Sequence, residues 1–325
     1  MPDAIVLKHL KKTFGETVAV RDLDLVVPEG ALYGVIGPNG AGKTTMIRMI
    51  LSILFPDQGE LTVLGRPSAL DAKDRIGYLP EERGLYKKMR VSEFLVYMAR
   101  LKGVDGGVDR QVRGWLERVD LADVAQKRCE ELSKGMQQKV QFVAAVIHKP
   151  DLLILDEPFS GLDPVNQRLL RDLVLAEHAR GATVLFSTHI MTHAEQLCDH
   201  VVMIHRGDKV LDQTMAGIRE TFDPHRILFE PLDPGADVQR LRSVPGVLTV
   251  TREGATWEIE LAPHARPAEV IPALVSLVVP SRVEVSRPTL EDVFVSIVSG
   301  DASRATDDSA RLRAALREGV QEVRR

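Results

Sequence analysis

The stretch GPNGAGKTT at residues 37–45 satisfies the pattern G-x-x-x-x-G-K-T, with Gly37, Gly42, Lys43 and Thr44 in the required positions. Glycine has no Cβ, so a glycine-rich backbone can wrap closely around a chain of phosphates. The backbone N–H groups of such a loop, and the positive end of the helix after it, then face the anion. The stretch therefore predicts a phosphate-binding loop.

The segments on either side supply the context that this loop requires. ALYGVIG (31–37) is an apolar run of strand length, and the residues from Lys43 to Leu54 have a helical pattern. In this setting the Lys43 ammonium would contact the β- and γ-phosphates, and the Thr44 hydroxyl would be offered to Mg²⁺. A glycine-rich turn before a helix is the alternative, and the Lys-Thr pair in register argues against it.

An acidic pair ends a second apolar run, DLLILDEP at residues 151–158. A strand that leaves a hydrophobic core delivers its last side chains to the carboxyl edge of the sheet, where ligands bind. Asp156 fits the role of holding Mg²⁺, directly or through water. Glu157 fits that of orienting and deprotonating an attacking water. An acidic strand end that only solvates a loop is the alternative, and the phosphate-binding loop earlier in the chain favours the catalytic interpretation.

As far as about Met215 the chain alternates short apolar runs with longer helical patterns. Continuous apolar strands between helices are typical of a parallel sheet covered on both faces. The residues from Val91 to Lys127 are mostly helical in pattern, with a predicted loop at the glycine-rich KGVDGG (102–107). The predicted fold class of residues 1–217 is therefore α/β, a P-loop NTPase core with a helical insertion over about residues 88–130.

The character of the chain changes after Gly217. The patterns now follow the order strand, helix, strand, strand, helix, strand, and Glu253 and Gly254 are predicted to turn the central hairpin. TWEIELA (256–262) alternates apolar with acidic residues, as a half-buried strand does. This order is that of the split βαβ, ferredoxin-like arrangement, so a small α+β accessory domain is predicted over residues 218–300.

A closing helix and a tail are predicted beyond these strands. Thr289 is an expected N-cap, with Asp292 three residues later. Residues 301 to about 309 have the composition of a linker. In the segment 301–325 a short amphipathic helix and a disordered tail are both compatible with the single helical stripe formed by Leu312, Leu316, Val320 and Val323.

Composition narrows the class of protein. A chain of 325 residues exceeds a typical single domain, so two domains are expected. The chain has 42 Lys plus Arg and 46 Asp plus Glu, which gives a net charge of −4 and argues against a general nucleic-acid binder.

Cys129 and Cys198 match no metal-ligand spacing, and reduced thiols are favoured over a single disulfide. No run approaches the roughly 18 to 20 apolar residues that span a bilayer, and the N-terminus lacks the apolar core of a signal peptide. We therefore expect a soluble chain whose membrane role depends on a partner.

Further segments resemble the motifs of the ABC ATPases and occur in that family's order. The resemblance extends from Ile5 to about Arg206. The segments are KTFGETVAV (12–20), similar to the start of the domain with its aromatic residue; IGYLPEE (76–82), similar to the Q-loop; LSKGMQQK (132–139), similar to the LSGGQ signature; SGLDP (160–164), similar to the D-loop; and STHIM (187–191), similar to the switch region.

The resemblance implies nucleotide contacts that the patterns alone do not assign. Phe14, where the family usually has Tyr, would stack on the adenine. His189, in the switch-histidine position, would contact the γ-phosphate and the attacking water, and would share catalysis with Glu157. The whole loop would hold the phosphates, through Gly37, Pro38, Asn39, Gly40, Ala41, Gly42, Lys43, Thr44 and Thr45.

The signature segment would act across a dimer. Ser133 and Gly135 would contact the γ-phosphate of ATP bound to the opposite protomer, at the start of a helix whose N–H groups face the anion. Asp163 would lie at the dimer interface and couple the two sites. One site then needs parts of two chains, so a homodimer or heterodimer of ATPase subunits with two ATP sites is implied.

Three residues depart from the family pattern at positions that would contact the nucleotide. Lys134 stands where Gly is usual, and it could add positive charge near the γ-phosphate or stay exposed. Met136 stands where Gln is usual and cannot supply an amide. Glu81 stands where Gln is usual; it can still bind Mg²⁺ through oxygen, beside Thr44 and Asp156, but it adds negative charge. These three changes leave the detail of those contacts open.

The combination of YLPEERGLY with LSKGMQQK resembles one branch of the family, the ATPase subunits of type 2 exporters, which includes sodium-efflux and drug-efflux proteins. RPTLEDVFVSIV (287–298) resembles the end of an accessory domain in that branch. The implied function is ATP hydrolysis with Mg²⁺ that powers transport, by branch export, through a separate multi-span membrane permease. The implied location is cytoplasmic, peripheral on the inner face of the cell membrane. No nucleic-acid partner is expected, and the cargo is not identified because its contacts belong to the permease.

Two other classes fit less well. Translation ATPases of this kind usually carry two nucleotide domains in one chain, and DNA-repair relatives have a long coiled-coil insertion; this chain has one phosphate-binding loop, one signature and no such insertion. A regulatory nucleotide-binding module with little catalysis is opposed by the intact Asp156, Glu157 and His189.

Overall fold

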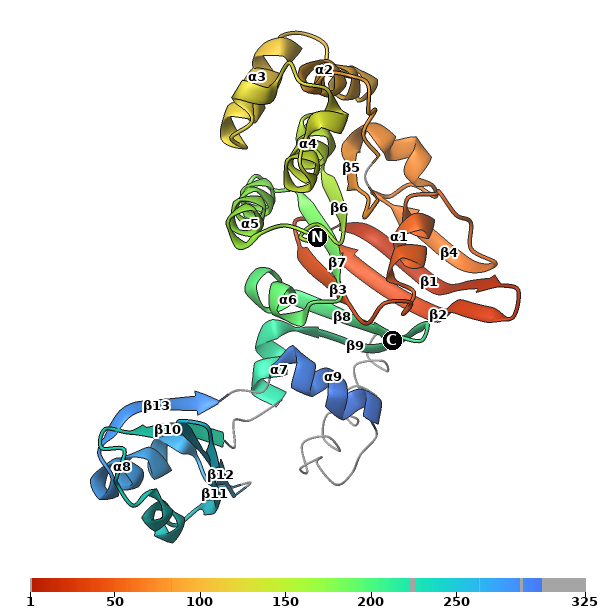
Figure 1. Ribbon diagram of the computed structural model, residues 1–325. Coiled ribbons are helices and arrows are strands. Elements are labelled where there is room, and N and C mark those ends of the chain that lie inside the picture. Colours follow the sequence, from red (N-terminus) through yellow and green to blue (C-terminus); the bar gives the residue numbers. More distant parts are fainter. Residues whose placement is uncertain (1, 83, 222–225, 263, 287–288, 300–325) are drawn as a thin grey trace. The chain divides into compact units, whose positions relative to one another are not determined.

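A computed structural model describes residues 2–82, 84–221, 226–262, 264–286 and 289–299. Its contacts divide the chain into two compact units, residues 1–213 and 214–325 (Figure 1). The predicted linker and tail at 301–325 lie outside the described residues.

The first unit is built on a six-stranded sheet in the order β5-β6-β7-β3-β8-β9. The paired strands from β5 to β8 run parallel. The strands β3, β6 and β7 are buried along their whole lengths, as continuous apolar runs require when both faces of a sheet are covered. The bounds are β3 (Leu32–Ile36), β5 (Ile76–Leu79), β6 (Leu152–Asp156), β7 (Thr183–Thr188), β8 (His200–His205) and β9 (Asp208–Thr214).

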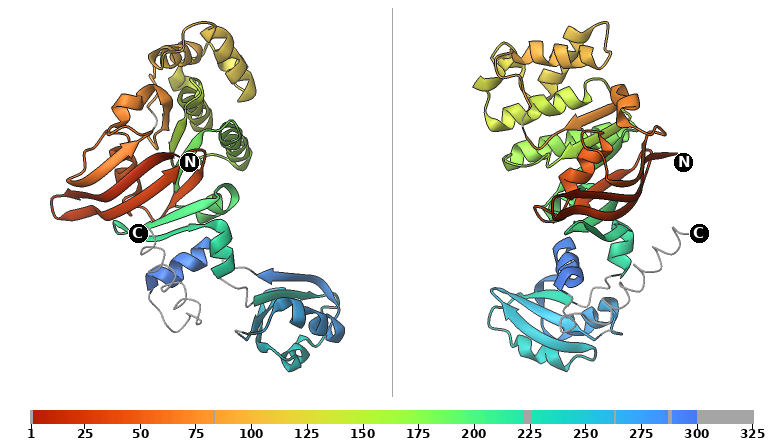
Figure 2. Two further views of the ribbon diagram at one scale, coloured as in Figure 1. Left: turned by 180° about the vertical axis from the view of Figure 1, so that it is seen from behind. Right: turned by 90° about the vertical axis from the view of Figure 1, so that its right-hand side faces the viewer.

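A separate antiparallel sheet, in the order β2-β1-β4, covers the helix that follows the phosphate-binding loop. The sequence patterns did not predict it. Its strands bury one face only, as the alternate burial of Leu23, Leu25 and Val27 shows. The helix α1 (Lys43–Ile50) lies between the two sheets (Figure 2), and one buried core joins all three. The strands are β1 (Asp3–Phe14), β2 (Thr17–Pro28) and β4 (Gln58–Val63).

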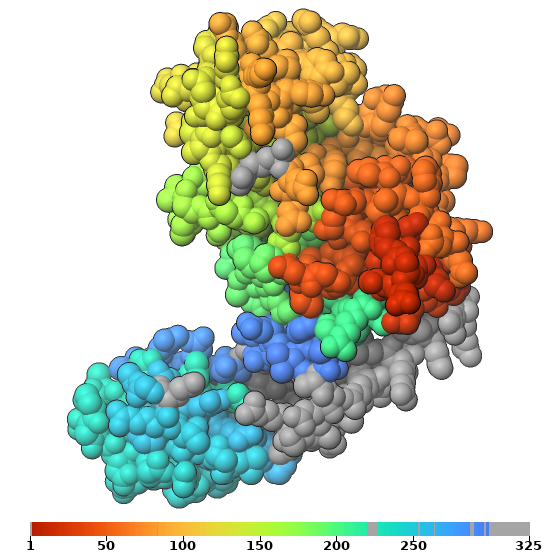
Figure 3. Space-filling model, turned by 45° about the vertical axis from the view of Figure 1, so that its right-hand side comes forward, coloured from red at the N-terminus to blue at the C-terminus, as the bar shows by residue number. Residues whose placement is uncertain are grey.

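A helical insertion is present between β5 and β6, as predicted, and its last helix lies beyond the predicted end at about residue 130. It holds α2 (Val91–Leu101), α3 (Val108–Arg118) and α4 (Lys134–Val146), with short 3₁₀ helices at Ala122–Val124 and Cys129–Glu131. The predicted loop at 102–107 separates α2 from α3. In Figure 3 the surface of α2 and α3 forms the orange-to-yellow lobe of the first unit. The other helices of this unit are η1 (Ala69–Arg75), α5 (Pro164–Ala179) and α6 (Met191–Leu197).

The second unit has the predicted ferredoxin-like order. Its four-stranded antiparallel sheet runs β11-β12-β10-β13, so the first and last strands are neighbours, as in a split βαβ arrangement. The hydrophobic core lies between this sheet and two of the helices of the unit, η4 and α8. The elements are α7 (Met215–Thr221), β10 (Arg226–Pro231), η4 (Val238–Ser243), β11 (Val247–Glu253), β12 (Thr256–Leu261), α8 (Pro267–Leu277), β13 (Pro280–Ser286) and α9 (Leu290–Ser299).

Two local predictions in this unit need correction. The first helix is the short 3₁₀ helix η4, and Pro-Gly pairs at 234–235 and 245–246 flank it in the sequence. Glu253 pairs with Thr256, so the hairpin turn is made by Gly254 and Ala255, and Gly254 has the left-handed φ of 64°. The N-cap at Thr289 is confirmed: its hydroxyl accepts from the Asp292 N–H at 3.2 Å.

The two cysteines are in the reduced state that the sequence favoured. Both Cys129 and Cys198 are buried and free, so neither forms a disulfide. Within the described ranges, no helix combines the length and the apolar character needed to cross a membrane.

Candidate active site

The loop between β3 and α1 has a backbone that tolerates no side chain at its two ends. Gly37 and Gly42 have φ of 154° and 112°. A Cβ at Gly37 would lie 2.1 Å from the Ile204 carbonyl oxygen, and one at Gly42 would lie 2.3 Å from the Ala19 carbonyl oxygen. The glycines of the sequence motif are therefore needed both for the conformation of the loop and for its contact with β8 and β2.

We predict that Gly42→Ala destabilises the protein more than Gly30→Ala does. Both glycines have positive φ, but a Cβ at Gly30 would have no atom within 4 Å. Gly30→Ala should therefore cost about 1–2 kcal/mol from backbone strain alone, whereas Gly42→Ala should cost a further ~1–3 kcal/mol from the clash with Ala19. Urea unfolding without nucleotide measures both. Equal losses of stability would show that the contact of the loop with β2 relaxes freely.

Lys43, the first residue of α1, is buried inside this loop. Its Nζ donates to the Gly37 carbonyl at 2.8 Å and to the Pro38 carbonyl at 3.2 Å. Burial lowers the pKa of the Lys43 ammonium, and the negative fields of Glu157, Asp156 and Glu81 oppose that shift. The ammonium is thus held at the mouth of the loop, where an anion would favour its charged form.

Asp156 ends β6 with one carboxylate oxygen bonded and the other without a partner. Oδ1 accepts from the Ser187 hydroxyl at 2.5 Å and from the Thr44 hydroxyl at 3.3 Å. Oδ2 is buried and has no hydrogen-bond partner among the described residues. A buried carboxylate oxygen without a partner destabilises the fold unless a hydrogen-bond donor or a cation binds to it. Mg²⁺ is usually bound through one or two carboxylates and phosphate oxygens, so Asp156 and Thr44 fit that ion.

Glu157 leaves the strand in a conformation that is rare for a residue with a side chain. Its φ is 49°, and its N–H donates to both the carbonyl and the hydroxyl of Ser187, each at 3.2 Å. The carboxylate Oε1 lies 2.9 Å from His189 Nδ1 and 3.8 Å from Lys43 Nζ. The chain reversal at Glu157 therefore brings a carboxylate, an imidazole and an ammonium together from β6, β7 and α1.

Ser187 is a site residue that sequence reasoning did not single out. It is fully buried and is the register partner of Asp156 across β6 and β7. Its hydroxyl contacts both members of the carboxylate pair. The one signal in the sequence was its place at the start of STHIM, the segment that also carries His189.

Other predicted nucleotide contacts lie around this centre. In the loop, Pro38 and Thr45 are half-buried, Ala41 is buried, and Asn39 and Gly40 are exposed. Glu81 lies just after β5, is exposed, and is close enough to act on the charge of Lys43. The ring of Phe14 is 49% exposed at the end of β1, on the β1–β2 hairpin that also supplies Ala19. An exposed ring at this place leaves a face open for stacking.

The signature residues form a second cluster. Ser133 caps α4 by accepting from the Met136 N–H at 3.3 Å, and Lys134 is exposed. Among the described residues, no hydrogen bond or ion pair joins residues 133–136 to the phosphate-binding loop. Gly135 instead lies close to Leu162 and Asn166. The backbone N–H and the side-chain amide of Asn166 both donate to the carboxylate of Asp163, which caps α5.

A hydrogen bond links α4, the helix that begins in the signature segment, to the segment that follows β6. The side-chain amide of Gln138 donates to the Pro158 carbonyl at 3.0 Å, and Gln138 is buried. Pro158 follows Glu157 directly. This hydrogen bond ties α4 to the segment that carries Glu157. Sequence reasoning did not assign Gln138.

Two family models match the chain in succession. The ABC transporter model matches residues 20–160, and the model described as the ATP-binding protein DrrA1-3-like C-terminal domain matches residues 214–298.

Relatives of known sequence cover most of the chain. A Bacillus subtilis protein described as the uncharacterized ABC transporter ATP-binding protein YhaQ is 41% identical over 295 residues, which are 90% of this chain and 98% of that protein. The ABC transporter ATP-binding protein NatA of the same organism is 39% identical over 208 residues, 62% of this chain and 85% of NatA. The Nod factor export ATP-binding protein I of Cupriavidus pinatubonensis is 39% identical over 210 residues, 63% of this chain and 65% of that protein.

Solved structures resemble the first unit. One described as the ATP-binding subunit of an ABC transporter has a TM-score of 0.63 and 32% identity, and the match covers 67% of this chain and 93% of that one. The fold is also shared with cbiO1 of Clostridium perfringens, at a TM-score of 0.59 and 22% identity over 66% of this chain and 89% of that one.

Proposed function

Because this chain belongs to the ABC transporter family of ATP-binding proteins, we propose that it hydrolyses Mg-ATP as a dimer and thereby drives export through a separate membrane permease. The observation that carries the proposal is the convergence of Lys43, Asp156, Glu157 and His189 from three segments of the first unit. These side chains are the cation, the metal carboxylate, the base and the orienting group that hydrolysis of a phosphoanhydride requires.

Binding would begin at the loop formed by residues 37–42. Its backbone N–H groups and the N-terminus of α1 would face the phosphates, and Lys43 would add a full charge. The Lys43 ammonium, which lies on the Gly37 and Pro38 carbonyls, would turn to the β- and γ-phosphates. Phe14 would stack on the adenine.

The metal would be held by Asp156 and Thr44, with Glu81 nearby. When bound, Mg²⁺ neutralises charge on the phosphates and fixes their orientation. The chain contributes the free Oδ2 of Asp156, and Ser187 holds the other oxygen so that Oδ2 stays available.

Glu157 would remove the proton from the attacking water. His189 Nδ1, which lies 2.9 Å from Glu157 Oε1, would hold the carboxylate in place, while the rest of the imidazole reaches the γ-phosphate. With its left-handed backbone, Glu157 has its carboxylate 3.8 Å from Lys43 Nζ. Positioning and electrostatic stabilisation would supply most of the rate enhancement.

We predict that Ser187→Ala weakens metal binding. Loss of the hydroxyl frees Asp156 to rotate, and loss of such a supporting hydrogen bond typically costs about 10- to 100-fold in metal affinity. The measurement is Mn²⁺ binding to the ATP-loaded protein by electron paramagnetic resonance. Thr183→Val is the matched control, because it removes a buried hydroxyl at the far end of the same strand, where it accepts from Gly30 N–H. A Mn²⁺ affinity within two-fold of the unmodified protein would contradict the role of Ser187.

The dimer would place Ser133, Lys134, Gly135 and Met136 of one chain on the nucleotide of the other, with Asp163 at the interface. The exposed cap of α4, which makes no recorded bond to its own phosphate-binding loop in the described part of the chain, supports this assignment. The bond from Gln138 to the Pro158 carbonyl would connect that contact to Glu157 of the same chain.

Light scattering tests the dimer. The Glu157→Gln variant with Mg-ATP should have twice the mass of the same variant without nucleotide. Gly135→Asp should abolish the ATP-dependent dimer, because it puts a carboxylate beside the γ-phosphate. Gly135→Ala is the control, since a Cβ there makes only ordinary contacts, at 3.5 Å and beyond. A protein that stays monomeric with ATP while binding it tightly would refute the shared site.

Export and a cytoplasmic, membrane-peripheral location are proposed from the predicted branch. One relative is named for Nod factor export, and the C-terminal unit matches the DrrA1-3-like domain. Affinity purification of the tagged chain from its own membranes tests the partner, and a multi-span permease is expected to co-purify. Recovery with ribosomes or DNA instead would favour the translation or repair alternatives.

A further inference from the structure

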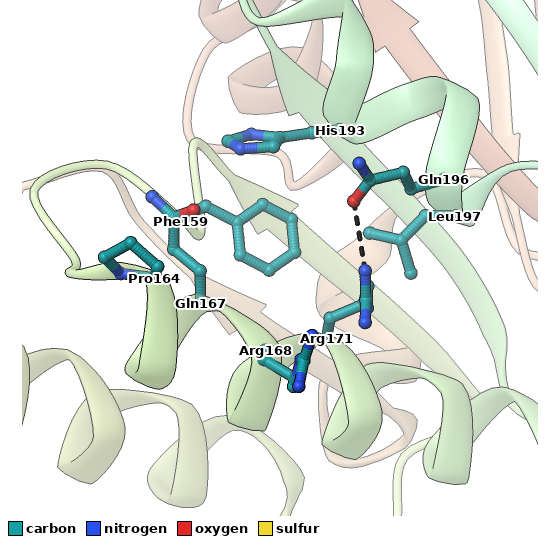
Figure 4. Close-up of a pocket in the computed structure, with 8 residues that line it drawn as sticks. All are labelled: Phe159, Pro164, Gln167, Arg168, Arg171, His193, Gln196 and Leu197. Carbon is teal, nitrogen blue, oxygen red and sulfur yellow. Dashed lines mark hydrogen bonds between the residues drawn. The ribbon is translucent and has the colours of Figure 1, made fainter. Parts of the chain in front are cut away.

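A pocket outside the nucleotide site opens between α5 and α6. Its volume is about 240 Å³, and its lining residues are Phe159, Pro164, Gln167, Arg168, Arg171, His193, Gln196 and Leu197. Figure 4 shows the two arginines rising from α5, His193, Gln196 and Leu197 facing them from α6, and the Phe159 ring between. The pocket thus has a polar, basic side and an apolar base.

The charge of the lining is of one sign. The positive charge comes from two arginines, because burial lowers the pKa of His193, and none of the eight lining residues is acidic. Arg168 and Arg171 lie one helical turn apart, so their guanidinium groups share one face of α5. Arg171 donates to Gln196 Oε1 at 3.0 Å and lies 3.9 Å from Asp172 Oδ1. No hydrogen bond or ion pair of the Arg168 side chain is recorded in the described part of the chain. The guanidinium of Arg171 is therefore held in place by Gln196, and that of Arg168 is available to bind a ligand.

His193 supplies a third polar group. Its Nδ1 is buried and has no hydrogen-bond partner among the described residues. The imidazole packs edge-on against Phe159, with ring centroids 5.0 Å apart. Buried polar atoms of this kind usually find a partner, and a ligand in the pocket would provide one.

We propose that this pocket binds a small organic anion, with its carboxylate on Arg168 and Arg171 and its apolar part on Phe159 and Leu197. Arginine presents paired N–H donors that match a carboxylate. The aromatic and aliphatic base excludes water from the rest of the ligand and favours a molecule with an apolar body over a bare oxyanion.

Such a ligand would lie next to the catalytic residues. Phe159 follows Glu157 by two positions, and the charge of Glu157 acts on His193. Occupancy would therefore restrain the segment 157–159. This consequence rests on the proposed ATP hydrolysis, whereas binding itself does not.

Calorimetry with benzoate tests the binding. The protein is first saturated with ADP so that the phosphate-binding loop is filled. Benzoate should bind, and benzamide, its neutral isostere, should bind at least tenfold more weakly. The Arg168→Gln/Arg171→Gln variant should lose about 10- to 100-fold in benzoate affinity and bind benzamide as before. Arg168→Gln alone, which breaks no hydrogen bond or ion pair among the described residues, controls for a folding defect, and ADP affinity reports the integrity of each variant.

Three results would overturn the proposal. Benzoate could fail to bind, or could bind the double-glutamine variant with unchanged affinity. Inorganic phosphate could bind as tightly as benzoate, which would show that the apolar base takes no part. Each of these outcomes is independent of ATP turnover, so failure of the pocket and failure of the proposed hydrolysis are separable.

Discussion

Replacing Glu157 with Gln is expected to lower the turnover number for ATP by about 100- to 10,000-fold, the usual contribution of a general base. The amide has nearly the same shape, and its oxygen can still accept from His189 at the position of Oε1, now 2.9 Å from Nδ1. It cannot take a proton from water. Affinity for ATP should stay within a few-fold of the unmodified protein, because the phosphates are held by the loop and Lys43. Turnover and nucleotide binding are measured on the same purified protein.

The matched control is Glu82→Gln, which removes an exposed carboxylate near the same site. Its turnover should be unchanged. Turnover by Glu157→Gln within threefold of the unmodified protein would show that another group is the base. Loss of ATP binding together with turnover would instead assign Glu157 a structural role, through its contact with Lys43 at 3.8 Å.

Lys43→Ala is expected to weaken ATP binding by about 100-fold or more. A hydrogen bond to a charged group contributes about 1.5–3 kcal/mol, and the ammonium can serve two phosphates at once, so a loss of roughly 3 kcal/mol corresponds to this factor. The variant also leaves the buried Glu157 with no ammonium beside it. Equilibrium binding of a fluorescent ATP analogue measures the affinity, and thermal unfolding measures the loss of stability.

Lys102→Ala provides a close control. Lys102 is half-buried, and its ammonium, like that of the buried Lys43, donates to two backbone carbonyls, those of Lys73 and Ile76, at 2.5 and 2.9 Å. Burial lowers the pKa of its ammonium as it does for Lys43. Lys102→Ala is expected to lower the thermal stability about as much as Lys43→Ala does, and to leave the affinity for ATP unchanged. Equal losses of affinity in the two variants would mean that Lys43 supports the fold of the loop without contacting phosphate.

Much of the molecule could be predicted from local patterns. The phosphate-binding loop, the acidic end of β6 and the cap of α9 each depend on residues within a few positions of one another, and short-range geometry decides them. The alternation of apolar runs with helical patterns predicted the parallel sheet and the helical insertion. In the second unit the order of patterns predicted the ferredoxin-like sheet.

Other features depend on which strands become neighbours. The antiparallel sheet over α1 was missed: its third strand, β4, is separated in the sequence from the β1–β2 hairpin by β3, the phosphate-binding loop and α1. The role of Ser187 was missed for the same reason: only the pairing of β6 with β7 sets it opposite Asp156. The basic pocket likewise joins α5 to α6, two helices separated by β7.

The sequence by itself determined the chemistry of the site, since Gly37, Gly42, Lys43 and the pair Asp156-Glu157 are defined by motif and by position at strand ends. Only the tertiary structure decided how these groups meet. Strand order and register are set by burial and hydrogen bonding between distant segments, which no local pattern contains. That packing brings Glu157 to 2.9 Å from His189 and 3.8 Å from Lys43, leaves Asp156 Oδ2 without a partner, and puts Arg168 and Arg171 opposite His193.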